Sequence, residues 1–392
     1  MARAVTADHV LFKESIQYFR PHPDRAASLV PRREPELFGH LLLDFNSPIE
    51  FTLGEFTIKP TTRVDLPQAY AAFVAPVELP RWVCDHHNGH LFTIALSSVF
   101  SFAAGRPTKS PRDDYLIGKT LTDSDFLALA IQFPVLVAGP GAHGVRPSKS
   151  TVERYHTYVQ DAVSALYKVP YSRYLDLMQG IRLVHMAHIN KRDDFSLAYA
   201  LIIAAIESVA QIAVPRDDVK EQHPSEDDWI SRARSDSVFK ELFAAYKQEC
   251  GKNQYLARRF IEFILHYCPV NSWDGLEHPY SDIAQIRAEL TGETPDNWLT
   301  EKRWFEVYPS DLSEEQVKIM LHDAYGHRSG FIHRGESPPH QQPVSSNRFF
   351  EEVFEYDESR KSLARLIVPN FRLMAYIAQH AILNFARECI DE

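Results

Sequence analysis

Cysteine is scarce in this sequence, and the four cysteines stand far apart. Cys84, Cys250, Cys268 and Cys389 form no CxxC pair, which excludes a disulfide framework and suits reduced thiols. Long apolar runs are also missing, because the longest, 197–206, is far shorter than the roughly 20 residues of a membrane span. The N-terminal residues have no apolar segment of the secretion-signal type. We therefore expect a soluble, cytoplasmic protein with no membrane partner.

Positive charge is in deficit. The chain has 42 Lys and Arg against 52 Asp and Glu, a formal net charge of −10. Nonspecific nucleic-acid binding depends on Lys and Arg that neutralise phosphates, so any nucleic-acid site here must be locally basic. The hydrophobic fraction of 45% is ordinary for a globular protein.

The length of 392 residues exceeds the usual size of one hydrophobic core and predicts two parts. Between residues 36 and 83, apolar and polar residues alternate, and Gly54 breaks the phase as a bulge or tight turn would. The apolar segment 91–104 precedes Gly105 and predicts a helix. We place the boundary near residue 147, so that 1–147 form a β-rich N-terminal domain of unknown role, a possible sensor or regulator.

From about residue 150 the apolar positions recur every three to four residues, which is typical of packed helices. The predicted helices include two late ones, at 313–334 and at 359–387, the second with a kink at Pro369. No internal repeat of 20 to 50 residues is present, so a solenoid is excluded. The expected fold class is α+β, with an all-α antiparallel bundle at 148–392.

Two motifs favour ordinary structural explanations. Gly139, Gly141 and Gly144 spell GxGxxG, but Pro147 follows and helices succeed one another, whereas a dinucleotide site needs a strand, a helix and a second strand. We interpret them as an interdomain loop. A small-molecule enzyme that uses this loop is the lowest-ranked hypothesis, and we expect no cofactor.

Histidine clusters raise the question of a metal. The segment CDHHNGH contains Cys84, His86, His87 and His90, but its spacing matches no standard zinc motif. His185 and His188 share a predicted helix without an HExxH pattern. We expect no metal at either place.

The most informative segment is DLSEEQVKIMLHDAYGHRSGFIHRGESPPH. Ser313 and Gln316 predict a capping box, and an apolar stripe predicts a helix that packs on the core. Its last turns carry proton-transfer and phosphate-binding side chains, namely His327, Arg328, His333 and Arg334.

This segment resembles the HEPN family, especially its ApeA-like members, which have a longer chain and a variable N-terminal region. The family's mark is an arginine followed after four residues by a histidine, and Arg328-Ser-Gly-Phe-Ile-His333 matches it. The apolar helix LAYALIIAAIESVAQIA, which carries Glu207, is similar to the family's other recognisable segment. The resemblance covers residues 150–392.

The resemblance implies a metal-independent endoribonuclease, a toxin-like or antiviral defence effector that leaves 2′,3′-cyclic phosphate ends. His333 would transfer protons, Arg328 would hold the phosphate, and His327 would assist. Glu207 would orient Arg328, while Ser329 and Arg334 would contact the RNA. Because Arg328 and His333 lie about 140° apart on a regular helix, convergence needs a loosened turn at Gly330. Family members instead combine two protomers, which implies a homodimer with a composite active site.

A different hypothesis comes from one departure from the pattern. Many active members have Asn, Asp or His directly after the arginine, where this chain has Ser329. The alternative is a catalytically silent HEPN module that binds RNA or a nucleotide, or that mediates dimerisation in a defence complex.

Overall fold

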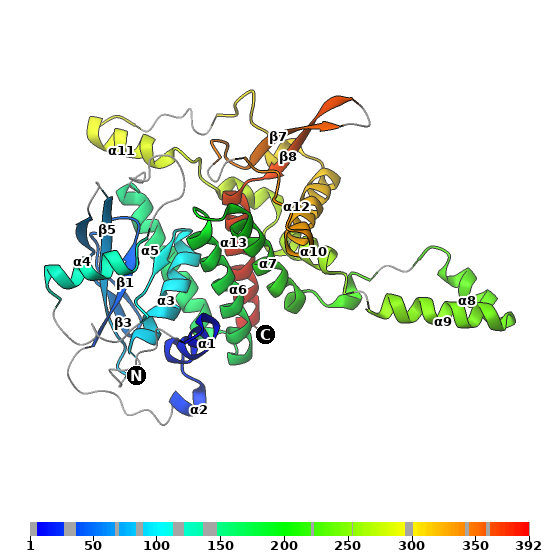
Figure 1. The fold of residues 1–392 in the computed structure, drawn as a ribbon, viewed down its shortest axis with the longest axis horizontal. Helices are drawn as coiled ribbons and strands as arrows, with labels where there is room; N and C mark the ends of the chain where they lie inside the picture. Colours follow the sequence, from blue (N-terminus) through cyan, green and yellow to red (C-terminus); the bar gives the residue numbers. More distant parts are fainter. Residues whose placement is uncertain are drawn as a thin grey trace.

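The fold is given by a computed structural model of the chain (Figure 1). An antiparallel sheet occupies the N-terminal part and helices dominate the rest, which confirms the predicted α+β class. The structure describes residues 6–26, 37–66, 70–83, 89–112, 121–135, 147–220, 223–252, 254–294, 301–341, 345–357 and 361–391.

The N-terminal sheet follows the order β2-β3-β5-β1-β6, and β4 pairs with the first part of β5. Every strand pair in it is antiparallel. Gly54 has φ +62° in the tight turn between β2 and β3, which explains the predicted break in phase. The strands are β1 (Phe38–Leu43), β2 (Phe51–Leu53), β3 (Phe56–Ile58), β4 (Thr62–Leu66), β5 (Tyr70–Glu78) and β6 (Thr108–Lys109).

Helices join this sheet to the rest of the molecule. Helix α3 (Gly89–Ala104) confirms the helix predicted at 91–104 and is buried along almost its whole length. It contacts β1 on one side and the bundle helices α5 and α6 on the other. Helix α1 (Asp8–Phe19), which the sequence did not predict, packs on α3. A short α2 (Pro23–Ala26) follows α1, and α4 (Asp123–Gln132) contacts β4 and β5.

The helices that follow confirm the predicted bundle, and one apolar cluster contains side chains of the sheet and the bundle together. The predicted boundary loop with Gly139, Gly141 and Gly144 lies outside the described residues. The main bundle helices are α5 (Lys149–Lys168), α6 (Tyr171–Asn190), α7 (Phe195–Ala213), α10 (Leu256–Tyr267), α12 (Glu314–Arg334) and α13 (Phe371–Asp391).

Helix α7 lies at the centre of this bundle. It contacts α6, α10, α12 and α13, and Ile202, Ile203 and Ile206 are fully buried. Among the described residues it is the one helix long and apolar enough to cross a membrane. Its packing on four neighbouring helices accounts for that apolar character, so α7 is a core helix.

Three further helices lie outside the main bundle. Helices α8 (Glu226–Ser235) and α9 (Ser237–Lys252) pack on each other and extend away from the body as an arm (Figure 1). Helix α11 (Ser281–Thr291) precedes α12 in the chain and lies above the sheet in the same view.

The C-terminal part differs from the all-α prediction at one place. A hairpin of β7 (Phe350–Asp357) and β8 (Ser362–Pro369) occupies the start of the segment predicted as helix 359–387. The helix begins after Pro369, and Asn370 accepts a hydrogen bond from the Leu373 amide at 2.8 Å. Pro369 therefore ends a strand and does not kink a helix.

Candidate functional site at the end of helix α12

Helix α12 begins and ends where the sequence predicts. The Ser313 amide donates to Gln316 Oε1 at 2.8 Å and the Gln316 amide donates to Ser313 Oγ at 3.3 Å, which is a complete capping box. Gly335 ends the helix with φ +69°. The first half of α12 packs in the core through Val317, Leu321 and other buried residues. This packing fixes the position of the second half, which carries the candidate site residues.

Arg328 and Glu207 form the predicted pair. Arg328 Nη2 lies 3.4 Å from Glu207 Oε2 and 3.5 Å from Oε1. The Glu207 side chain is 7% exposed and the Arg328 side chain 22% exposed. A carboxylate from the core helix α7 therefore holds a guanidinium that lies at the edge of solvent.

Glu207 has two more partners, and sequence reasoning missed both. Gln211, one turn later on α7, donates Nε2 to Glu207 Oε1 at 3.2 Å. Tyr325 lies near Glu207, and burial together with the Glu207 charge raises the pKa of Tyr325 to about 12. The Arg328 guanidinium lies 6.0 Å from the Tyr325 ring centre. The signal available in the sequence was spacing: Gln211 follows Glu207 by four residues and Tyr325 precedes Arg328 by three.

His333 lies on a different side of the helix. Helix α12 continues without a break through Gly330 to Arg334, so the turn at Gly330 is not loosened. Five residues of regular helix separate Arg328 and His333 by about 140°. His333 is exposed, whereas Arg328 is largely covered. The two side chains of one chain therefore do not face a common point.

The other predicted site residues on α12 differ from one another in burial and in their partners. His327 and Ser329 are half-buried. Burial lowers the pKa of His340 to about 4, and the nearby His327 contributes in the same direction. Arg334 is exposed and makes a bidentate pair with Glu336 at 2.5 and 2.7 Å, so its fork is already occupied by a carboxylate.

The histidine clusters do not assemble into a metal site in the part of the chain that is described. No group of three or more His, Cys, Asp and Glu side chains there has the geometry to hold a metal ion. His90 is buried in α3, while Cys84, His86 and His87 lie outside the described residues. Burial lowers the pKa of His185 to about 4 and the pKa of His188 to about 3, so both are neutral at pH 7.

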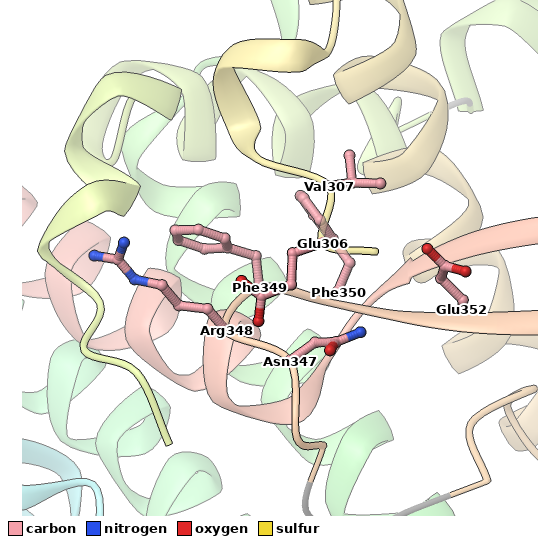
Figure 2. A pocket seen from close by; sticks show the side chains of 7 residues that line it. All are labelled: Glu306, Val307, Asn347, Arg348, Phe349, Phe350 and Glu352. Atoms are coloured by element: carbon pink, nitrogen blue, oxygen red, sulfur yellow. The ribbon is translucent and has the colours of Figure 1, made fainter. Parts of the chain in front are cut away.

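A shallow hollow lies elsewhere, between the start of β7 and the segment before α12 (Figure 2). Arg348 and Glu352 lie on opposite sides of it (Figure 2). The Arg348 guanidinium donates to the backbone carbonyls of Leu276 and Asp274, and it lies 4.8 Å from the Phe349 ring. None of the predicted site residues lines this hollow.

Comparison with known proteins returned no match to a family model, to a curated protein or to a solved structure.

Proposed function

We propose that this protein is a metal-independent endoribonuclease of the HEPN type that acts in the cytoplasm, as a toxin-like or antiviral effector. The observation that carries the proposal is the Arg328–Glu207 pair at the end of α12. A buried carboxylate fixes an arginine at the solvent edge, five residues before an exposed histidine on the same helix.

The chemistry fits these residue types. RNA supplies its own nucleophile, the 2′-hydroxyl, so cleavage needs a proton-transfer group and a cation that stabilises the charge on the phosphorane. His333 takes the first role and Arg328 the second. The products are a 2′,3′-cyclic phosphate and a 5′-hydroxyl end, and no metal takes part.

The separation of Arg328 and His333 around α12 supports a site built from two copies of the chain. The exposed positions of α12 include Ile319, His322 and Gly326 and then His333, which spaces them along one side of the helix. Ile319, on this side, is 54% exposed. Packing this side against its copy across a two-fold axis brings His333 of each protomer toward its partner.

The test is incubation of the purified full chain with total RNA in EDTA, with analysis of the product ends. Wild type is expected to produce 2′,3′-cyclic phosphates, and His333→Ala is expected to lower the rate by at least about 100-fold, as the loss of a general acid or base does. The control is His266→Ala, because His266 is an exposed histidine on a different helix, α10, outside the proposed contact, and is 69% exposed. It should retain the wild-type rate.

The silent-module alternative predicts another pattern. Ser329 directly after Arg328 is the feature that favours it. Wild type would then cleave no RNA under any condition, and RNA binding would weaken mainly when Arg328 is changed. Cleavage that survives His333→Ala but disappears in EDTA would contradict both hypotheses.

A further inference from the structure

Three cations lie within electrostatic range of one another where the N-terminal sheet and the helical bundle join. Arg106 follows α3, Lys191 ends α6, and Arg372 lies in the first turn of α13. Tyr155 of α5 lies within range of Arg106 and Arg372. The three cations belong to separate elements, so the fold and not local sequence brings them together.

Among the residues that the structure describes, Arg106 alone of these cations has a matching anion. Arg106 Nη2 lies 2.7 Å from Asp44 Oδ2, and the Asp44 side chain is 1% exposed. Within the described residues, neither Lys191 nor Arg372 forms an ion pair. Lys191 Nζ instead lies 4.5 Å from the Phe371 ring centre, and Arg372 Nη1 is buried without a hydrogen-bond partner.

The acids nearest to Arg372 are Glu277 and Asp282, and both have other partners. Glu277 Oε2 lies 2.5 Å from Arg154 Nη2. Asp282 Oδ1 accepts a hydrogen bond from the Ser148 amide at 3.0 Å. The charge of Glu277 is therefore already paired with Arg154, whereas Asp282 lies within electrostatic range of Arg372 and Arg106 but, among the described residues, forms an ion pair with neither.

Placing cations together in this way has a cost in free energy of solvation. A largely buried cation without a counter-ion loses hydration without regaining it from a partner. The effect is visible at Lys191, where burial and the neighbouring Arg372 and Arg106 lower the pKa to about 7. His188, which faces the same cations, has its pKa lowered to about 3, mainly by burial.

We propose that Lys191, Arg372 and Arg106 form a binding site for the phosphate group of a small ligand. A guanidinium fork and an ammonium are the side chains that pair with phosphate oxygens, and Arg372 lies at the N-terminal end of α13, where the helix dipole also favours an anion. Lys191 and Arg372 are partly exposed, so a small anion reaches them. The site is separate from Arg328 and His333 and does not depend on the proposed ribonuclease activity.

The test is titration calorimetry of the full chain at constant ionic strength, with inorganic phosphate in one arm and nucleoside 5′-mono- and triphosphates in the other. Saturable binding of one ligand per chain is expected in at least one arm. Tighter binding of a nucleotide than of phosphate identifies a nucleotide site, and the reverse identifies a site for free phosphate.

Two variants on different elements test the assignment. Lys191→Met and Arg372→Gln should each weaken binding at least about tenfold, the effect of losing one charge-assisted hydrogen bond. Arg387→Gln is the matched control, because Arg387 is on the same helix α13 but 53% exposed, and lies 3.7 Å from Asp161. It should bind like wild type, and so should His333→Ala.

Wild type alone already decides the main point, because the absence of saturable binding in both arms would overturn the proposal. Equal weakening in Arg387→Gln would also overturn it, since the interaction would then be general charge attraction. Lys191→Met is not expected to lower the melting temperature of the ligand-free protein, because it removes a cation without a counter-ion and keeps most of the aliphatic length. A large loss of melting temperature in that variant would show that Lys191 is structural and would contradict the site.

Discussion

Two regions of the molecule contain partly buried cations in opposite electrostatic environments. Arg328 has a carboxylate partner, whereas Lys191 and Arg372 have none among the described residues. At the end of α12, Glu207 lies 3.4 Å from Arg328, and Tyr325 lies beside both residues. At the junction of sheet and bundle, Lys191 and Arg372 have no such acid among the described residues. A cation with a buried carboxylate is held in one position, whereas a cation without one keeps its charge available to a ligand.

The presence or absence of a carboxylate partner suits a basic residue to one of two roles in this protein of net charge −10. At Arg328 the acid lowers the net charge but fixes the guanidinium, which suits stabilisation of charge in a transition state, where orientation matters more than attraction. At the junction the positive charge is concentrated, which suits capture of an anion. Each role can be tested by changing the residue that distinguishes the two regions.

The largest expected effect concerns the two arginines of α12. Arg328→Lys should lower RNA cleavage by about 100-fold or more, because an ammonium keeps the charge but loses the bidentate fork and its fixed orientation. Arg334→Lys should keep most of the activity, because Arg334 is 63% exposed and already paired with Glu336. The measurement is the single-turnover cleavage rate in EDTA. Equal loss in the two variants would mean that positive charge alone matters at this end of the helix.

The second effect concerns the acids of the two pairs on α12. Glu207→Gln should lower the free energy of unfolding by about 2 kcal/mol, because it leaves the largely covered Arg328 without its counter-charge. Glu336→Gln should leave it almost unchanged, since both members of that pair are more than half exposed. Urea denaturation at pH 7 measures both. Similar values for the two variants would contradict the structural role assigned to Glu207.

The third effect is a dependence of stability on pH at the junction. Burial lowers the pKa of His188 to about 3, so the folded state binds fewer protons than the unfolded state once the pH falls below the unfolded pKa near 6.5. Stability is then complete above pH 6.5 and is lost progressively toward pH 3, by on the order of 1 kcal/mol in the first pH unit. Urea denaturation at pH 7 and at pH 5.5 should show a smaller difference in His188→Gln than in wild type, and no such change in His322→Gln.

The course of α12 was predictable because its signals are local. Ser313 and Gln316 cap its start and Gly335 ends it, and each acts through neighbours in the sequence. The pair of Glu207 and Arg328 was predicted from a family resemblance, not from spacing, since 121 residues separate them. Their partners Gln211 and Tyr325 were missed, although each lies within one helical turn of a residue already singled out.

The hairpin and the cation cluster were not predictable in the same way. Strand β8 contains Leu363, Ala364 and Arg365, which have high helix propensity, and it is a strand because β7 pairs with it. Lys191 stands at the end of α6 and Arg372 in the first turn of α13. Basic residues are common at helix ends, so neither residue is distinctive in the sequence. Their significance depends on the packing of α6 against α13, which is a tertiary contact.

The smallest expected effect comes from two glycines, one within α12 and one directly after it, whose substitutions should change stability in opposite directions. Gly335 has φ +69°, and an added Cβ would meet no atom within 4 Å. Gly335→Ala should therefore lower the free energy of unfolding by about 1 kcal/mol through backbone strain alone. Gly326 is helical and exposed, and its Cβ would also meet nothing within 4 Å, so Gly326→Ala should raise it by about 0.5–1 kcal/mol.

The same pair of variants probes the exposed side of α12 in the proposed dimer. If that side packs against its copy, the methyl group added at Gly326 enters the contact between protomers, and RNA cleavage should fall although the fold becomes more stable. Gly335→Ala, which lies beyond the helix, should lower stability with a smaller effect on cleavage. Urea denaturation and the cleavage rate, measured on the same preparations, separate the two quantities. A Gly326→Ala protein that is more stable and fully active would show that the surface around residue 326 stays free of a partner, and the composite site would then have to be formed by the last turn of α12 alone.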